Sequence, residues 1–348
     1  MFSLRQINNW ARIGSPVLAL SLAMVLTALL LQLLGYDPLK VMRILFWQPW
    51  SMVGGFAAIL NRAAPLTMIA MGLSFGLRAG IWNLGAEGQL IIGACAATAV
   101  ALTVPLSQPI LALLVMAAAG AMGGAIWGLI AAGLYLRFKS NLIVISLMLV
   151  FVAQAVLNGL VFGPWRDPSG YNYPQSAVFA PQFWLPNIDG FPLFHSAILI
   201  AVAILVGGGI VAKYSRWNLG LKLAGESSQV AAYGGFSSSH QILSTLLVGG
   251  AAAGMAGMTM VAGSLGQLSG SVMQNYGFTA ILVAFLGRLS AVGIALAGLL
   301  VALLTVGGES LRIEQGMSDS FVMGMAGLIL LTLVAVDGLL NRRGQHDQ

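Results

Sequence analysis

Gly76 to Leu90 reads GLRAGIWNLGAEGQL, and this stretch interrupts a long apolar region with glycines, an arginine, an asparagine and a glutamate. The segments on either side of it are longer and almost wholly apolar. Polar groups are costly to place in such surroundings, and inside a membrane they commonly mark function. The stretch therefore predicts a polar break at the centre of a hydrophobic protein.

The composition is that of an integral membrane protein. Hydrophobic residues make up 58% of the 348 residues and charged residues only 7%, far below the roughly 25% charge of a soluble domain. The apolar segments have the length of membrane-spanning helices, about 17–25 residues, and lack the alternation of an outer-membrane barrel. We expect an all-α, polytopic membrane protein with about ten spans, forming one transmembrane domain over residues 1–348.

The basic residues predict the orientation. If the amino terminus lies in the cytoplasm, alternating spans place eleven lysine and arginine residues inside and five outside, which is the positive-inside bias. The inner set is Arg5, Arg12, Arg78, Arg137, Lys139, Lys213, Arg216, Lys222, Arg288, Arg342 and Arg343. The outer set is Lys40, Arg43, Arg62, Arg166 and Arg312. We therefore expect both termini in the cytoplasm, and the net charge of +6 indicates span ends rather than a nucleic-acid partner.

Two long polar segments lie on opposite sides of this predicted topology. Residues 163–193, rich in proline and aromatics, form an outer loop that we expect to be a docking surface, or else a lid without a partner. Residues 213–240 form a cytoplasmic segment with three basic residues and the small-residue run Ala231-Ala232-Tyr233-Gly234-Gly235. The small residues permit close approach of another surface, and Gly225 and Gly235 are expected to bound a short helix there.

The first half of the chain has a faint counterpart in the second. A shift of 178 residues places Gly76 on Gly254, Gly85 on Gly263 and Gly88-Gln89-Leu90 on Gly266-Gln267-Leu268. The first copy lies at a predicted inner turn and the second at a predicted outer turn, which is the arrangement of an inverted repeat with broken helices near the midplane. After the second copy, the apolar piece Phe278 to Leu286 is too short to cross alone, so it is either extended by residues 271–277 or discontinuous.

Gly120, Gly124 and Gly128 follow one another at four-residue spacing within the expected span Ile110 to Leu136. This spacing places them on one helix face, where a neighbouring helix can approach closely. We interpret the stripe as a packing surface rather than a substrate site.

Several kinds of chemistry are missing from the sequence. It contains no GxxxxGK[ST] phosphate-binding loop, and His195, His240 and His346 have no metal-binding spacing. No nucleophile, base and orienting group can be placed together, so we expect neither an enzyme nor a cofactor nor a metal site. There is also no series of intramembrane acids for a proton relay, which indicates that energy for transport enters from another chain through residues 213–240.

Three strings carry a resemblance to a known family. These are IWNLGAEGQLIIGA (Ile81 to Ala94), LKLAGESSQVAAYGGFSSS (Leu221 to Ser239) and YGFTAILVAFLGRLSAVG (Tyr276 to Gly293). They resemble the permease subunits of bacterial ABC (ATP-binding cassette) importers for nucleosides and simple sugars, a group related to ribose and branched-chain amino-acid permeases. The NLGAEGQ string favours the nucleoside branch.

The resemblance implies an inverted-repeat permease in the bacterial inner (plasma) membrane, surrounded by lipid. Its implied partners are a second permease, identical or homologous, an ATP-binding subunit with two nucleotide-binding domains, and an extracytoplasmic substrate-binding protein. It also implies a cytoplasmic helix that inserts into the ATP-binding subunit, here within Glu226 to Phe236. The residues expected to couple to the ATPase are Glu226, Ser227, Ala231, Ala232, Tyr233 and Gly234. The usual arginine-rich approach is absent, since Lys222 precedes Glu226, which leaves the ionic pairing with the ATPase open.

Five polar residues are candidates for the substrate pathway, because amides and carboxylates satisfy the donors and acceptors of a base or ribose. They are Asn83, Glu87, Gln89, Gln267 and Asn275. The alternative for each is hydrogen bonding between helices, and Glu87 could instead pair with Arg78. At the level of the whole chain, we expect nucleoside import by alternating access, with a simple-sugar importer, an ion-coupled secondary transporter and a structural scaffold as alternatives.

Overall fold

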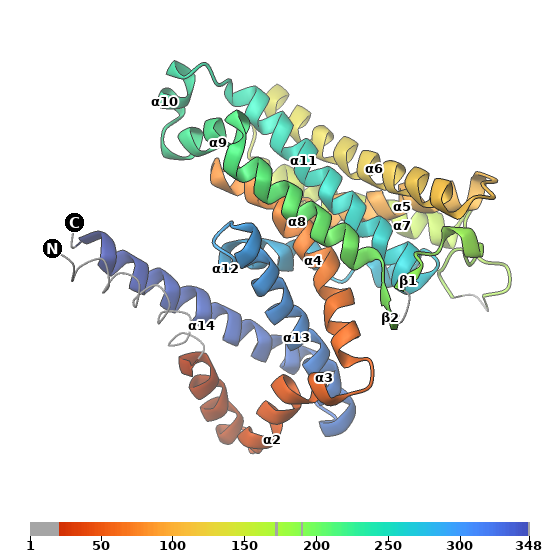
Figure 1. Ribbon diagram of the computed structural model, residues 1–348, viewed down its shortest axis with the longest axis vertical. Helices are drawn as coiled ribbons and strands as arrows, with labels where there is room; N and C mark the ends of the chain where they lie inside the picture. Colours follow the sequence, from red (N-terminus) through yellow and green to blue (C-terminus); the bar gives the residue numbers. More distant parts are fainter. Residues whose placement is uncertain (1–20, 171–172, 189–190, 347–348) are drawn as a thin grey trace. The chain divides into compact units, whose positions relative to one another are not determined.

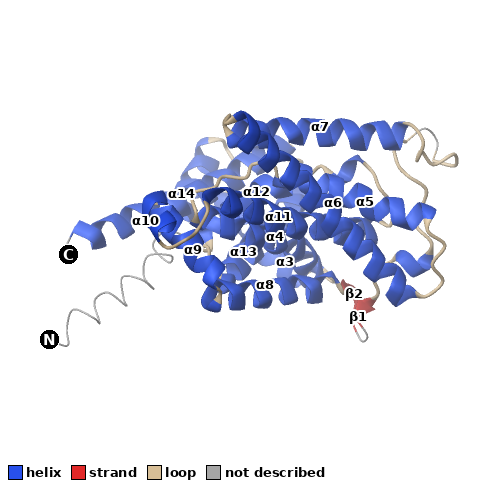
Figure 2. Cartoon of the chain, turned by 90° about the horizontal axis from the view of Figure 1, so that it is seen from above, coloured by secondary structure: helices blue, strands red, loops and turns tan. Residues whose placement is uncertain are grey.

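A computed structural model describes residues 21–170, 173–188 and 191–346, and this part of the chain is almost entirely helical (Figures 1 and 2). Its only regular strands are β1 (Asn187–Ile188) and β2 (Phe191–His195), an antiparallel pair in which Asn187 lies opposite His195. The described residues form two compact units, one of residues 60–299 and the other of the residues on either side of that range. The unit boundaries fall inside two helices, α4 and α13.

Seven helices in the described part are long and apolar enough to cross a membrane. They are α4 (Gly55–Arg78), α5 (Ala86–Thr103), α6 (Pro109–Phe138), α7 (Leu142–Phe162), α8 (Ala197–Tyr214), α11 (Ser238–Thr259) with its continuation η3 (Met260–Leu265), and α13 (Ala291–Gln315). Shorter apolar helices cover Ser21–Leu33, Gly270–Leu286 and Ser320–Thr332. The all-α membrane fold is confirmed, whereas the count of ten spans is not.

The second copy of the repeat is irregular. Helix α11 passes into η3, a π-helix, and Gly266 then takes a left-handed conformation with φ of 66°. A 3-10 turn, η4 (Gly270–Val272), precedes α12 (Tyr276–Leu286), which has 11 residues. The gap between η4 and α12 favours the discontinuous reading of this region, because α12 begins only at Tyr276.

The core of the larger unit is a close packing of α5, α6 and α11, which lie side by side in Figure 1. A side chain at Gly254 of α11 would collide with the backbone of Gly120 on α6, and a side chain at Gly93 of α5 would collide with the backbone of Gly254. Gly124 and Gly128 of α6 likewise meet the backbone of α11. The predicted glycine stripe is thus a backbone-to-backbone contact, as expected where small residues let membrane helices approach.

The smaller unit contains α2 (Pro38–Met42), η1 (Arg43–Trp47) and α3 (Gln48–Ser51), followed much later by the end of α13 and by α14 (Asp319–His346). Asp37 caps α2, since its carboxylate accepts from the backbone amides at residues 39 and 40. Gly307 of α13 lies directly against the backbone of Leu45, and Tyr36 stacks on Phe321 with ring centroids 5.5 Å apart.

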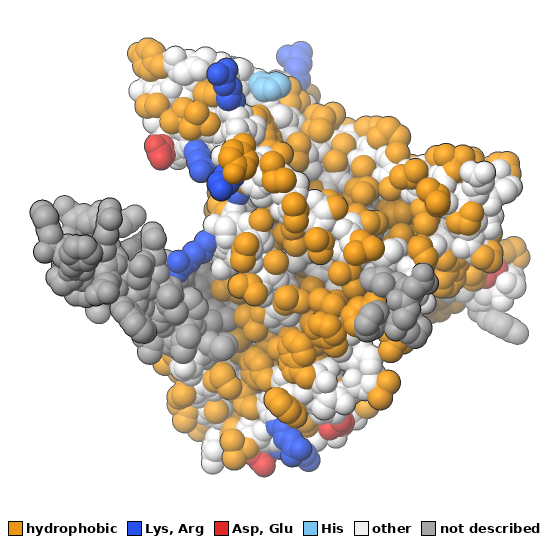
Figure 3. All heavy atoms as spheres, in the orientation of Figure 1, with side chains coloured by type: hydrophobic (Ala, Val, Ile, Leu, Met, Phe, Trp, Pro, Cys, Tyr) orange, Lys and Arg blue, Asp and Glu red, His pale blue; other side chains and the backbone are white. Residues whose placement is uncertain are grey.

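Three further elements lie near the candidate site: η2 (Pro181–Phe183) in the loop after α7, and α9 (Arg216–Glu226) and α10 (Ser228–Tyr233) between α8 and α11. Apolar side chains cover most of the visible flank of the larger unit, whereas lysine and arginine side chains gather at the end occupied by α9 and α10 (Figure 3). This separation fits a protein whose flank faces lipid and whose charged end faces water.

Candidate functional site

The polar stretch is a break between two helices. Helix α4 ends at Arg78, a turn follows in which Gly80 has φ of 71°, and α5 begins at Ala86. The carbonyl of Gly76 accepts from the backbone amides of Ala79 and Ile81, which closes the turn. The break places the side chains of the stretch among the neighbouring helices instead of along a single helix face.

Glu87 links this stretch to the second half of the chain through two hydrogen bonds. Its side chain is 0% exposed, and its two carboxylate oxygens accept from the backbone amides of Asn275 (2.9 Å) and Gly277 (2.6 Å). Asn275 has φ of 59°, and α12 has no side-chain cap from its own segment. Because the first amides of a helix lack partners within the helix and carry partial positive charge, Glu87 caps α12 from another helix.

The stretch continues alongside α12 in the opposite direction. Trp82 stacks on Phe285 with ring centroids 5.3 Å apart, and the guanidinium of Arg78 donates to the carbonyl of Leu289, just after α12 ends. The predicted polar break is therefore bonded to α12 at both of its ends and packed against it between them. The sequence repeat pointed to a relation between the two halves but not to this pairing.

Arg78 and Glu87 do not pair with each other in this arrangement. Besides Leu289, Arg78 donates to Oδ1 of Asn218 at 2.7 Å, and its guanidinium lies 5.1 Å from the ring centroid of Phe75. Both side chains therefore have other partners, and the interpretation of Glu87 as the counter-ion of Arg78 has no support in this geometry.

Asn83 and Gln89 form a buried pair within the first half. Nδ2 of Asn83 donates to Oε1 of Gln89 at 3.0 Å, and Oδ1 of Asn83 accepts from the backbone amide of Gly85, also at 3.0 Å. Both side chains are almost fully buried. Their polar groups thus stabilise the entry into α5 in this conformation, and contact with a substrate stays a prediction for both.

Gln267 and Asn275 lie elsewhere. Gln267 donates from Nε2 to Oε1 of Gln175 at 2.9 Å, while its own buried Oε1 has no hydrogen-bond partner among the residues that the structure describes. The side chain of Asn275 is exposed at the start of α12. The structure thus brings Asn83 together with Gln89, and Glu87 together with the backbone of Asn275, but it places Gln267 apart, beside the loop after α7.

That loop is bonded to the second copy of the repeat. The backbone amides of Ser176, Phe179 and Leu185 donate to carbonyls at residues 268, 266 and 262, each at 2.8 Å. The ring of Trp184 lies where a side chain at Gly266 would be. Further out, hydrogen bonds from the hydroxyl and backbone amide of Ser169 lower the pKa of the exposed Asp167. Asp189, in the same predicted loop, lies outside the described residues.

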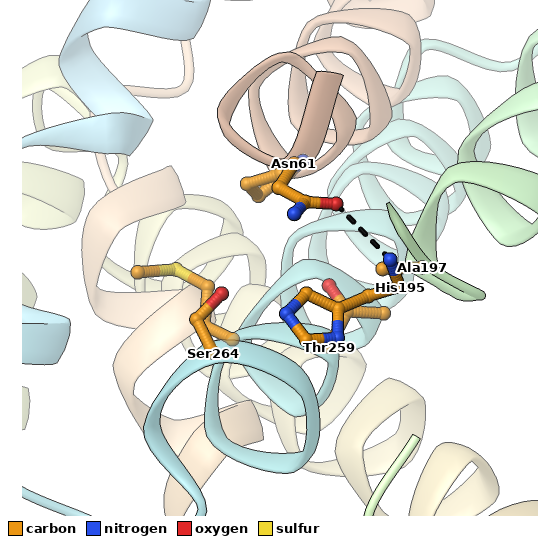
Figure 4. Close-up of a pocket in the computed structure, with 7 residues that line it drawn as sticks. Asn61, His195, Ala197, Thr259 and Ser264 are labelled. Carbon is orange, nitrogen blue, oxygen red and sulfur yellow. Dashed lines mark hydrogen bonds between the residues drawn. The ribbon is translucent and has the colours of Figure 1, made fainter. Parts of the chain in front are cut away.

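A small cavity opens between α4, which contains a proline, and the π-helix η3 (Figure 4). Pro65 in α4 and the π-helix η3 contribute to its walls, together with Asn61, His195 and Thr259. It offers about 10 Å³ to the centre of a water molecule, close to the minimum for one water. Asn61 accepts from the backbone amide of His195, and burial lowers the pKa of the His195 imidazole.

Among the described residues, no group of three His, Cys, Asp or Glu side chains could hold a metal ion.

On the other side of the unit, α9 is anchored to the helices of the core. Trp217 stacks on Phe75 with centroids 5.0 Å apart and donates to the hydroxyl of Ser244 at 2.9 Å. Gln241 of α11 donates to the carbonyl of Gly220 at 3.0 Å. These contacts fix α9 against both α4 and α11.

The short helix α10 follows α9 and projects from it. Ser227 caps α10 at the amide of Val230, and the helix ends before Gly235, whose φ is 80°. Tyr233 is 93% exposed, whereas Ala231 is buried; the remaining predicted coupling residues are Glu226, Ala232 and Gly234, all exposed. Gly235 bounds the short helix as predicted, but Gly225 does not, because it lies inside α9 and contacts the carbonyl of Arg78.

Some residues of the site were not predicted as such from the sequence. Arg78 was assigned to the positive inner side and considered as a partner of Glu87, and Trp82 and Asn218 received no role. Asn218 is a buried polar residue on an amphipathic helix, α9. In the sequence it looks like a solvent-exposed asparagine, because its partner Arg78 lies 140 positions away.

Comparison with known proteins identifies the family. Residues 55–334 match the family described as the permease component of a branched-chain amino acid transport system. A glucose ABC transporter permease of Haloferax volcanii is 36% identical over 95% of this chain and 89% of its own length. A guanosine ABC transporter permease of Bacillus subtilis is 26% identical, covering 95% and 97%, and a nucleoside ABC transporter permease of Lactococcus lactis is 22% identical, covering 93% and 91%. No solved structure matches the chain.

The helical membrane architecture and the match across most of the chain agree with each other. The family component is the membrane permease. The chain therefore belongs to the branched-chain amino acid transport permease family and is a multi-pass permease subunit of an ABC transporter in the plasma membrane.

Proposed function

We propose that this permease imports nucleosides by alternating access, driven by ATP hydrolysis on a partner subunit. The observation that carries the proposal is the match of nearly the whole chain to a guanosine and a nucleoside ABC transporter permease. The NLGAEGQ string at residues 83–89 supports the same branch. A second permease copy, identical or homologous, completes the pathway, and both termini lie in the cytoplasm.

The segment 213–240 is the docking site for an ATP-binding subunit with two nucleotide-binding domains. Two features of the structure support this part of the proposal. Helix α10 presents Tyr233 almost fully exposed, and exposed aromatic side chains are common anchors of protein interfaces. Helix α9, from which α10 projects, is fixed to the core through Trp217 and Gly220.

The loop 163–193 receives the substrate-binding protein on the opposite side. Its backbone bonds to residues 262–268 support this role, because a force on the loop would reach the second copy of the repeat directly. A lid without a partner would not need these bonds to a broken helix.

Substrate passes between the two copies of the repeat. Gln267 and Asn275 are the candidates for direct contact in the conformation described, since Gln267 has an unpartnered acceptor and Asn275 is exposed. Asn83 and Gln89 line the pathway in the conformation reached after the helices move, because in the described conformation they are buried and bonded to each other. Glu87 borders the pathway while it stays bonded to the first amides of α12.

A simple sugar is the second candidate substrate. The 36% identity to a glucose permease exceeds the identities to the guanosine and nucleoside permeases. Ribose is part of a nucleoside, so a site that binds hydroxyl groups through amides would serve either class.

The test is uptake by the complete transporter in proteoliposomes, with the binding protein outside and ATP inside. We expect ATP-dependent accumulation of labelled guanosine that unlabelled guanosine abolishes and excess glucose leaves unchanged. ATP-dependent accumulation of labelled glucose, without accumulation of labelled guanosine, would favour the sugar instead. Uptake by this chain alone, driven by an ion gradient, would refute ATP-driven transport and indicate a secondary transporter.

A further inference from the structure

We propose that Arg78 transmits the movement of α9 and α10 to α12, and that this positioning residue keeps ATP hydrolysis coupled to transport. The proposal rests on the proposed function, since it takes residues 213–240 as the docking site for the ATP-binding subunit. It assigns the first polar residue of the break a role that is separate from contact with substrate.

The guanidinium of Arg78 joins two segments that are otherwise distant in the sequence. One nitrogen donates to Oδ1 of Asn218 on α9 at 2.7 Å, and another donates to the carbonyl of Leu289 in the turn after α12. A planar guanidinium presents several donors in a fixed geometry, so it can hold two acceptors at once. A lysine ammonium at the same position could reach one of them but not keep both in this arrangement.

The acceptor of Arg78 on α9 is held in place. Asn218 is 2% exposed and donates from Nδ2 to the carbonyl of Ala212 at 2.6 Å, which fixes its side chain. A side chain at Gly225 would collide with the carbonyl oxygen of Arg78, so the end of α9 lies directly on the end of α4. A displacement of α9 therefore reaches Arg78 through both its side chain and its backbone.

The turn after α12, which holds the other acceptor of Arg78, is also constrained. Arg288 and Leu289 have φ of 49° and 54°, a left-handed conformation that residues with a side chain adopt only when their surroundings hold them there. The other end of α12 is bonded to Glu87. Since α12 is attached at both ends to the stretch that carries Arg78, a pull on Leu289 displaces α12 as a whole rather than unwinding one turn.

The choice of residue at this position also favours a role in transmission. Burial lowers the number of water molecules available to a guanidinium, and both acceptors of Arg78 described here are neutral. Apolar packing at the end of α4 would avoid this desolvation cost. The half-buried Arg78 is therefore better explained by the connection that it makes between α9 and the end of α12 than by a contribution to stability.

The experiment measures ATP hydrolysis and substrate uptake in the same proteoliposomes, using the complete transporter with Arg78→Lys. We expect ATP hydrolysis close to that of the wild type and a fall of at least about fivefold in substrate imported per ATP, the low end of typical coupling between sites. The matched control is Arg137→Lys, the same exchange at an exposed position in the last turn of α6, which should leave the ratio unchanged.

An unchanged ratio in Arg78→Lys would overturn the proposal, and so would a parallel loss of both activities, because either result would make Arg78 a purely structural residue. If Arg78→Lys does not assemble, Asn218→Ala removes the acceptor on α9 while Arg78 remains, and it must lower the same ratio. A wild-type transporter that imports nothing in the presence of ATP would instead refute the proposed function, so the two failures are distinguishable.

Discussion

Glu87 supplies both acceptors for the first amides of α12, so its replacement should be costly. Glu87→Gln keeps the size of the side chain but exchanges one acceptor oxygen for an NH2 group, which then faces a backbone amide. Leaving a buried amide without an acceptor costs about 1–3 kcal/mol. We expect a lower melting temperature of the detergent-solubilised protein and weaker uptake. The control Glu226→Gln changes an exposed glutamate, and equal melting of the two variants would contradict the capping role.

His195 should make the stability of the protein depend on pH. Burial lowers the pKa of its imidazole, so the unfolded chain takes up a proton first as the pH falls below about 6.5. Stability should therefore decrease with falling pH until the pH passes the lowered pKa of the folded state. Melting curves measured between about pH 8 and pH 5 should show a smaller decrease for His195→Gln than for the wild type. The exposed His240→Gln should behave as the wild type, and identical profiles for all three would contradict this role of His195.

At the scale of the element, α11 packs more tightly at Gly254 than at the nearby Gly249. A methyl group at Gly254 would collide with the backbone of α6, whereas one at Gly249 would lie 3.7 Å from its nearest neighbour, an ordinary contact. Overpacking of this kind costs about 1–3 kcal/mol, while alanine in a helix otherwise gains up to about 1 kcal/mol over glycine. We expect Gly254→Ala to lower the melting temperature and Gly249→Ala to maintain or raise it. The reverse order would contradict the packing described.

Helix α10 should contribute to partner binding without contributing to the fold. Tyr233 is 93% exposed, so Tyr233→Ala removes little packing within this chain. We expect the variant to melt like the wild type but to retain less ATP-binding subunit during purification of the complex. Ala231 provides the contrast, because a larger residue at this buried position should disturb the attachment of α10 itself. Full retention of the ATP-binding subunit by Tyr233→Ala would remove this side chain from the interface.

Some elements and contacts could be predicted from the sequence, and others could not. The apolar segments and the four-residue glycine spacing on α6 predicted spans and close packing, because both depend on periodicity along one helix. The cap of α12 by Glu87 was not predictable, since it joins residues about 190 positions apart through backbone amides, which leave no side-chain pattern. The inner boundary at Gly225 was predicted incorrectly for a related reason: this glycine permits contact with the carbonyl of Arg78, and does not end a helix.

At the scale of the whole molecule, the larger unit has a polar segment attached to each copy of the repeat. Residues 213–240 contact the first copy through Asn218 and Gly225, and the loop 163–193 contacts the second through the backbone of residues 262–268. The two copies of the repeat that these segments contact lie in opposite halves of the sequence. This arrangement is consistent with two different partners each acting on a different copy. The single-domain organisation and the orientation of the termini stay predictions.

The shortness of α12 has a consequence for how the permease can change shape. With 11 residues it is roughly 16 Å long, about half the thickness of a hydrocarbon core. Since Arg288, just after α12, is predicted at the cytoplasmic side, we expect the end of α12 at Glu87 to lie at depth. Separating Glu87 from that end would leave a bare carboxylate and free amides in a medium with nothing to replace either. The junction should therefore survive the whole transport cycle, and the flexing that opens one side or the other must take place in backbone outside it.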